Sequence, residues 1–153
     1  MGTALERLAE LGLRLPQVPV PAGSYVPAAQ AGALVYTAGQ LPFVDGRIEV
    51  TGKVGAGVTA EQANALARVC ALNALAAVDA LVGLDRVVSV VRVGGFVAST
   101  PEFTGHPGVV DGASNLLAEV FGAAGRHARV AVGVAALPLD ASVEVELIVE
   151  IAP

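Results

Sequence analysis

The sequence predicts an α+β fold, in which two long helices pack on one face of a mixed β-sheet. Two segments carry apolar residues at helical spacing, and β-branched runs lie before, between and after them. The two runs that close the chain alternate apolar and polar residues, which is typical of strands with one buried face. This order of strands, helix, strand, helix and two closing strands fits a sheet with both helices on one side.

Length and composition predict one domain, residues 1–153, that associates with copies of itself. A chain of 15.3 kDa buries a single core, and hydrophobic residues make up 54% of it, with a mean hydropathy of +0.67. Charges and glycines interrupt its apolar runs before the roughly 20 residues that a membrane span needs. Four charged side chains in residues 1–15 argue against a signal sequence. We therefore expect an oligomer without a membrane partner, which hides apolar surface between subunits.

Charge, histidine and cysteine content argue against several other classes. The net charge is −5 and the nine basic residues do not cluster, so no nucleic-acid partner is expected. The two histidines, His106 and His127, are 21 residues apart without a further ligand at metal spacing, so no metal site is expected. The single Cys70 cannot form an internal disulfide and has the apolar neighbours of a buried helix residue. This fits a reducing, cytoplasmic location.

Local signals predict the elements of the first half of the chain. We expect, in order, a short amphipathic helix within residues 1–15 (about 3–14), an extended proline-rich segment (15–27), a strand (33–38), a turn at Asp45-Gly46 with a short returning strand (47–50), and a glycine-rich loop (54–58). Thr59 and Gln62 then form a capping box that begins a long helix, and Gly83 is its expected end.

The second half is predicted by the same kind of signal. A strand over 86–97 and a loop over 99–108 lead to a helix with Pro107 in its first turn, which ends at Gly122 or Gly125. The last two strands, 128–136 and 142–151, are expected to form a hairpin. Side-chain alternation predicts which face of each strand lies beneath the helices. These faces carry the valines at 130, 132 and 134 and the apolar residues at 143, 145, 147 and 149. Self-association would bury the opposite faces, with Arg129, Glu144, Glu146 and the valines at 88 and 90.

Arg129 stands in an otherwise apolar strand and therefore needs a carboxylate partner. Glu144 or Glu146, across the predicted hairpin, could supply one within the protein, and a ligand could supply one from outside. Both interpretations stay open on the residues alone. The two glutamates share one strand face, which suits either two-carboxylate chemistry or a solvated face.

Three segments together resemble the RidA (YjgF/YER057c/UK114) superfamily. The first joins residues 23–25 (Gly-Ser-Tyr) to residues 37–42 (Thr-Ala-Gly-Gln-Leu-Pro), the second is Ala128-Arg129, and the third joins residues 137–138 (Leu-Pro) to residues 143–146 (Val-Glu-Val-Glu). They occur in the order and at the spacing of the family, and the resemblance extends over nearly the whole chain from residue 23.

The resemblance implies a chorismate-mutase-like fold that forms a homotrimer with a central β-barrel. It implies a site between subunits that hydrolyses reactive 2-imino or enamine acids to 2-keto acids and ammonia, without a metal or an organic cofactor. Arg129 would hold the substrate carboxylate and Glu144 would position or activate water. Tyr25 and the backbone at Ala38 and Gly39 would line the pocket.

Several positions differ from the pattern of the active members. Ala38 replaces a serine, His127 replaces a proline, and Ala131 replaces a cysteine; Asp111 or Asn115 would stand for an asparagine on the second helix. Two functions therefore remain: a deaminase, and a non-catalytic trimeric module that binds a small carboxylate metabolite. His127 and His106 are either proton donors in the cleft or surface or interface residues.

Overall fold

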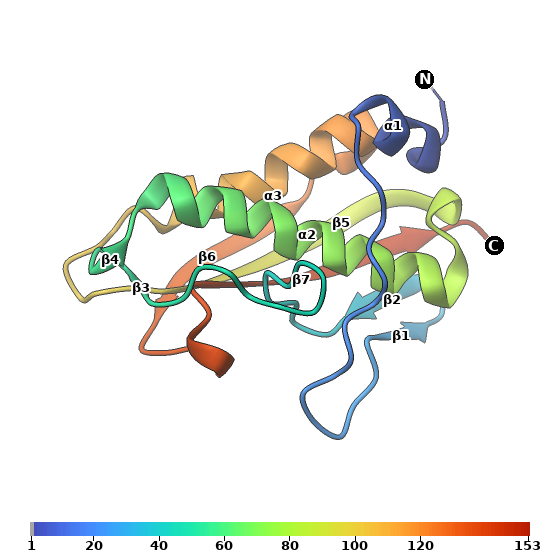
Figure 1. The fold of residues 1–153 in the computed structure, drawn as a ribbon. Helices are drawn as coiled ribbons and strands as arrows, with labels where there is room; N and C mark the ends of the chain where they lie inside the picture. The colour runs from blue at the N-terminus through green and yellow to red at the C-terminus, as the bar shows by residue number, and fades with distance from the viewer. Residues whose placement is uncertain (1) are drawn as a thin grey trace.

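The computed structural model describes residues 2–153 as a sheet of five strands with its helices on one face (Figure 1). The sheet has the order β1-β2-β7-β5-β6, and β3 and β4 form a separate parallel pair. The strands are β1 (Ala28–Ala31), β2 (Leu34–Thr37), β3 (Lys53–Val54), β4 (Gly57–Val58), β5 (Val87–Ala98), β6 (Ala128–Val134) and β7 (Val143–Ile151). The α-helices are α1 (Ala4–Glu10), α2 (Ala60–Val82) and α3 (His106–Phe121), with 3-10 turns at Leu84–Arg86, Gly122–Gly125 and Pro138–Asp140.

The sheet is mixed, as predicted. β6 runs parallel to β5, whereas the β1–β2, β2–β7 and β5–β7 pairs are antiparallel. Helix α3 connects β5 to β6, because a parallel neighbour requires a crossover of about a dozen residues or more.

The predicted capping box begins α2. The Thr59 hydroxyl accepts from the Gln62 N–H at 3.1 Å, and the Gln62 side chain accepts from the Thr59 N–H at 2.9 Å. The helix ends at Gly83 as expected. Pro107 lies in the first turn of α3, and Gly122 follows its last residue.

Helix α2 is long and apolar enough to cross a membrane by length and composition alone, with a mean hydropathy of 1.7 over its most apolar window. From the sequence we expected no apolar segment long enough for a membrane span and did not consider this helix. Half of that window is buried inside the fold, where α2 packs against α3 and the sheet, which is the environment of a core helix. Cys70 lies on this buried face, as predicted, and its burial raises the pKa of the thiol.

Pairing register defines the two faces of the sheet. Val93 of β5 lies opposite Leu147 of β7 and opposite Arg129 of β6, and paired residues point to the same side. Val93 and Leu147 are buried beneath the helices. The other side carries Glu144 of β7 and Val132 of β6, both paired with the same residue of β5, Phe96. In the single chain this second side has no helix over it (Figure 1).

Two predictions about the closing strands are wrong. β6 and β7 do not form a hairpin, because β7 inserts between β2 and β5 while β6 takes the outer edge of β5. Arg129 and Ala131 face the helices, whereas Val130, Val132 and Val134 face away. Alternation divides a strand into two faces but does not say which face is covered, and this edge strand has apolar residues on both.

Smaller differences concern short elements. Residues 47–50 form no strand beyond one bridge between Val44 and Arg47, the glycine-rich loop contains β3 and β4, and β1 was not predicted. Val90 is buried rather than exposed, because a bulge shifts its register. The first helix is shorter than predicted, and the predicted segment 1–15 begins at Met1, which lies outside the described residues.

Close contact between α2 and α3 requires glycine at position 112. A Cβ atom there would collide with the backbone oxygen of Asn64 in α2, whereas one at Gly108 would meet nothing. We expect Gly112→Ala to lower the free energy of unfolding by about 1–3 kcal/mol through overpacking. Gly108→Ala, on the same helix, should raise it by roughly 0.5–1 kcal/mol, since glycine disfavours helices. Urea denaturation measures both, and equal stability of the two variants would contradict this packing.

Candidate functional site

A pocket at the start of β7 brings together three predicted site residues, Tyr25, Gly39 and Glu144. Its volume is about 50 Å³. The other lining residues come from the proline-rich segment, from the chain after β2 and from the turn before β7: Pro19, Val20, Pro21, Ala22, Pro27, Gln40, Leu41, Phe43 and Pro138. Ala38, the fourth predicted pocket residue, does not line it, and its N–H donates to the Pro27 carbonyl at 2.8 Å.

Backbone pairing places Gly39 against Glu144. Gln40 and Val145 exchange two hydrogen bonds of 2.8 and 3.0 Å, which hold the chain after β2 beside β7. A Cβ atom at position 39 would lie 2.6 Å from Glu144 Oε1, so any larger residue would displace this carboxyl group from its present position. From α2, the buried Asn73 side chain donates to the Leu41 and Phe43 carbonyls at 3.0 and 3.1 Å and fixes that wall.

Glu144 has the electrostatics of a proton-exchanging group. Burial raises the pKa of its carboxyl group, and the neighbouring charge of Glu146 raises it further. No cation pairs with either glutamate within residues 2–153. A partly buried, unpaired carboxyl group with a raised pKa in a pocket is a candidate for acid–base chemistry.

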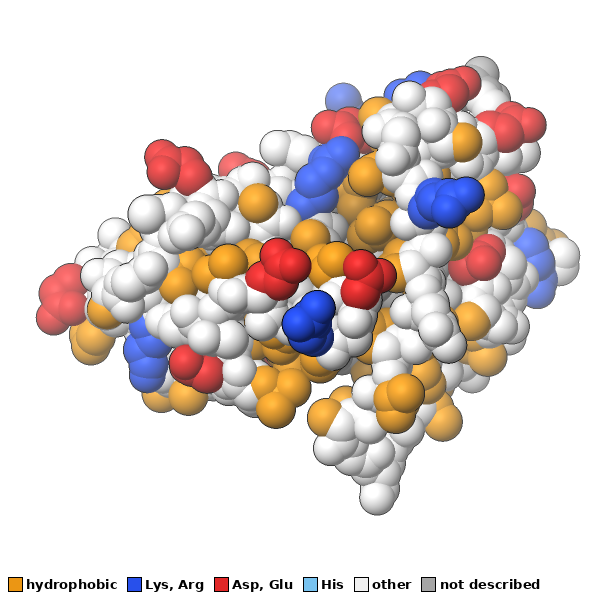
Figure 2. Space-filling view, viewed as in Figure 1, with side chains coloured by type: hydrophobic (Ala, Val, Ile, Leu, Met, Phe, Trp, Pro, Cys, Tyr) orange, Lys and Arg blue, Asp and Glu red, His pale blue; other side chains and the backbone are white. Residues whose placement is uncertain are grey.

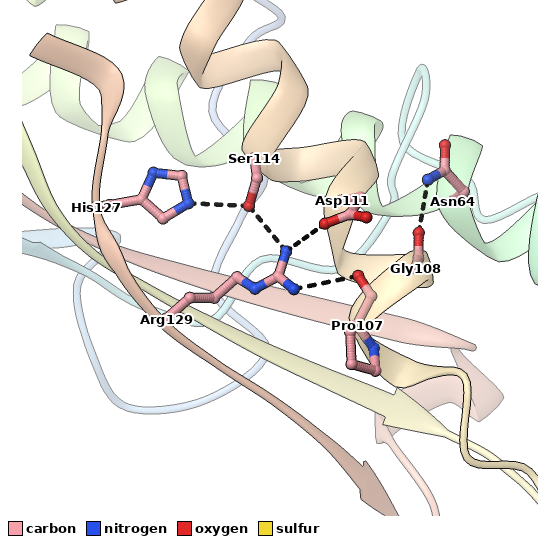
Figure 3. A network of polar contacts seen from close by, with 7 residues as sticks. All are labelled: Asn64, Pro107, Gly108, Asp111, Ser114, His127 and Arg129. Atoms are coloured by element: carbon pink, nitrogen blue, oxygen red, sulfur yellow. Dashed lines mark hydrogen bonds and ion pairs between the residues drawn. The ribbon is translucent and has the colours of Figure 1, made fainter. Parts of the chain in front are cut away.

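Arg129 lies in a separate polar network beneath α3 (Figure 3). Its Nη1 donates to Asp111 Oδ1 at 2.7 Å and to Ser114 Oγ at 3.1 Å, and its Nη2 donates to the Pro107 carbonyl at 3.3 Å. Of the two interpretations that the residues left open, a pair between Arg129 and Glu144 or Glu146 within the chain is therefore excluded. β5 separates the two strands, and both glutamates point to the other face of the sheet.

The network continues to His127 and fixes its tautomer. The Gly125 carbonyl can only accept, so the 2.6 Å contact places a hydrogen on His127 Nδ1. In the neutral ring, Nε2 then accepts from the Ser114 hydroxyl at 2.9 Å, and Ser114 Oγ accepts from Arg129 (Figure 3). Sequence analysis missed Ser114, although it follows Asp111 at the i, i+3 spacing that places two side chains on one helix face.

Of the two remaining candidates, His106 lies apart from both groups, whereas Asp111 belongs to the network around Arg129. His106 contacts Ser99 Oγ through Nε2 at 3.0 Å, in an open pocket at the end of β6. Asp111, rather than Asn115, contacts Arg129. Among residues 2–153, no group of three or more histidine, cysteine or acidic side chains could hold a metal ion.

The first helix does not cover the Glu144 pocket. α1 packs on the far end of α3, where the Arg7 Nε donates to the Glu119 carbonyl at 3.2 Å (Figure 1). The proline-rich segment that follows α1 crosses to the pocket and supplies its outer wall, residues 19–22.

The candidate site residues therefore form two separate groups within one chain. Tyr25, Gly39 and Glu144 share a pocket, whereas Arg129 is not among the residues that line it. Arg129 also faces the helices, while Glu144 faces the uncovered side of the sheet.

This mixed sheet with its helices on one face defines an α+β protein of the chorismate-mutase-like kind. A family model described as "YjgF/chorismate_mutase-like, putative endoribonuclease" matches residues 5–151, and the chain belongs to this family. The resemblance to the RidA superfamily is confirmed.

Relatives match over nearly their full length. Protein TCP17 of Trypanosoma cruzi is 44% identical over 152 residues, which are 98% of this chain and 95% of that protein. The crystal structure of Atu1372 from Agrobacterium tumefaciens, a protein of unknown function, is 48% identical with a TM-score of 0.90 and covers 97% of this chain and 92% of its own. The YjgF gene product of E. coli is 28% identical with a TM-score of 0.63, covering 88% and 93%.

The raised pKa of Glu144 predicts how stability depends on pH. Between the ordinary pKa of glutamate and the raised one, the folded chain binds more protons than the unfolded chain, so stability falls as pH rises through this window. Glu144→Gln removes this cost and should raise the Tm at neutral pH, while the difference disappears in acid. Thermal unfolding across pH measures the effect, with the exposed Glu150→Gln as the control. A lower Tm of Glu144→Gln at neutral pH would contradict the assignment.

Proposed function

We propose that this protein is a homotrimeric hydrolytic deaminase that converts reactive 2-imino or enamine acids to 2-keto acids and ammonia. The site would form between subunits, without a metal or an organic cofactor, and the enzyme would work in the cytoplasm. The reaction adds water across the carbon–nitrogen double bond and then expels the nitrogen. The observation that carries the proposal is the shared pocket of Tyr25, Gly39 and Glu144.

Glu144 would serve as the acid–base group. As a carboxylate it takes a proton from the attacking water, and as a carboxylic acid it returns that proton to the leaving nitrogen. A general base works best when its pKa lies near the working pH, and burial moves the pKa of Glu144 in that direction. The proton-exchanging role thus explains why a carboxyl group is kept where it lowers stability.

Arg129 would hold the substrate carboxylate. Its contacts with Asp111, Ser114 and Pro107 use three of the five guanidinium N–H groups, and Nε makes no hydrogen bond within the described chain. Nε and Nη2 can therefore donate two parallel hydrogen bonds to a carboxylate, while α3 holds the guanidinium plane in place. Positioning the carboxylate fixes the electrophilic carbon near the water.

Association of three chains would complete the site. The pocket volume of about 50 Å³ is far below the roughly 300–1,000 Å³ of ordinary ligand sites, so a second surface is needed to enclose a substrate. The uncovered face of the sheet presents large apolar side chains to solvent, including Tyr36 and Val132, each 43% exposed. Self-association of this face would bury them in a central barrel and bring the edge of one chain to the pocket of the next.

A binding module for a small carboxylate metabolite is the second candidate. Ala131, two residues after Arg129 on the same strand face, offers no nucleophile. Endoribonuclease action, which the family description names, has less support. The chain has a pI of about 4.9, and its basic side chains are scattered among acidic ones on the face in Figure 2.

Removal of either key side chain should reduce turnover. The assay measures ammonia released from imino acids that an amino-acid oxidase forms in situ. We expect Glu144→Gln to lose about 10²–10⁴-fold in rate, as for an acid–base group. Arg129→Ala should lose about 10–100-fold in kcat/KM, as for a charged hydrogen bond. The exposed neighbour Arg126→Ala should match the wild type. Equal rates for all variants would rule out the deaminase, and calorimetric binding of 2-keto acids without turnover would favour the binding module.

A charge on the uncovered face should dissociate the trimer. We expect light scattering to give the wild type three times the chain mass of 15.3 kDa, and Val132→Asp the mass of one chain, since burying an unpaired carboxylate is costly. Leu81→Asp alters a similarly exposed side chain (46%) on the helical layer and should leave the trimer intact. A monomeric wild type would contradict the assembly.

A further inference from the structure

We propose that Asp111 and Arg129 together form a subsite for a zwitterion, in which Arg129 takes a carboxylate and Asp111 takes the cationic nitrogen on the adjacent carbon. The ligand class is a protonated 2-imino acid or a 2-amino acid. This inference deepens the proposed function, since it rests on Arg129 as the carboxylate anchor and adds a residue that recognises the other charge.

The pair presents two opposite charges side by side toward solvent. Nη1 of Arg129 and Oδ1 of Asp111 are 2.7 Å apart, and the side chains are 21% and 53% exposed. Asp111 Oδ2 makes no hydrogen bond within residues 2–153, and neither does Arg129 Nε. Each partner of the ion pair therefore retains a polar group for a ligand (Figure 3).

The charge balance favours a zwitterion over a plain anion. Asp111 already neutralises Arg129, so the attraction of Arg129 for an incoming carboxylate without a cation is partly offset by repulsion from Asp111. A ligand with a cationic nitrogen beside its carboxylate meets an opposite charge at both groups. Asp111 is the more exposed partner of the pair, and its carboxylate would receive the ligand nitrogen.

The surrounding network adds no further cation in its neutral state. His127 donates through Nδ1 to the Gly125 carbonyl, and in the neutral ring its Nε2 accepts from Ser114. The titratable and charged groups joined by these contacts are Asp111, His127 and Arg129, and their sum is then zero. Ser114 also ties Arg129 to α3, so both charges of the pair are held by the same helix.

The subsite would distinguish substrate from product. Hydrolysis converts an iminium carboxylate and water into a 2-keto carboxylate and ammonium: the C=N bond breaks, the water oxygen becomes the carbonyl oxygen, and the nitrogen leaves with both hydrogens of the water. The substrate carries both charges, whereas the 2-keto acid carries only the negative one. Asp111 would stabilise the iminium form, which is the more electrophilic one, and would repel the product carboxylate.

The test compares three ligands of equal size that differ only at the second carbon. Calorimetry measures the Kd of L-alanine, L-lactate and pyruvate for the wild type. We expect L-alanine to bind about tenfold more tightly than the other two, as for one additional charged hydrogen bond. Asp111→Asn should abolish this preference, by weakening L-alanine and strengthening the two anions. Glu119→Gln, which removes the carboxylate of another ion pair on α3, should keep it.

Two results would overturn the subsite. One is that the wild-type protein binds L-alanine no more tightly than L-lactate and pyruvate. This measurement needs only the wild type, so it does not depend on whether a variant folds. The other is an Asp111→Asn variant that binds all three ligands more tightly by the same factor, because Asp111 would then only neutralise Arg129. Neither result depends on turnover. The deaminase can fail its ammonia assay while the preference for zwitterions holds, and the preference can be absent from an active enzyme.

Discussion

Side-chain alternation in the central sheet is the constraint on which the site depends. Pairing through β5 puts Arg129 on the face beneath the helices and Glu144 on the uncovered face, with a whole strand between them. No rotamer change can bring these two groups together in one chain. A site that uses both must take them from different copies of the chain. Such an assembly would account for the unpaired glutamate, the small pocket and the uncovered apolar face together.

Much of the fold follows from local signals in the sequence, and three of the candidate site residues lie together in the structure. The capping box at Thr59 and Gln62 and the stop at Gly83 fix α2, because caps act within a single turn of helix. The resemblance to the RidA superfamily implied that Tyr25, Gly39 and Glu144 share a pocket, and the structure adds that the missing side chain of Gly39 leaves space beside the carboxyl group.

Non-local choices could not be predicted in the same way. The order of the strands depends on which edge of β5 each later strand reaches, and alternation in β6 is the same whichever face is covered. One of the two candidate partners of Arg129 depended on a hairpin that does not form, whereas its partner within the chain, Asp111, comes from the helix above the strand. β1 consists of Ala-Ala-Gln-Ala, which has little strand propensity. Its backbone hydrogen bonds with β2, rather than its own residues, stabilise it as a strand.

Mixing two impaired variants tests the shared site most directly. Glu144→Gln and Arg129→Ala are each expected to retain at most about a tenth of wild-type turnover, and they are unfolded and refolded together in equal amounts. In a mixed trimer, an intact site forms wherever the glutamate of one copy meets the arginine of the next, so about a quarter of wild-type deaminase activity should return. Mixed trimers that form and stay as impaired as the separate variants would contradict a site built from Glu144 of one chain and Arg129 of another.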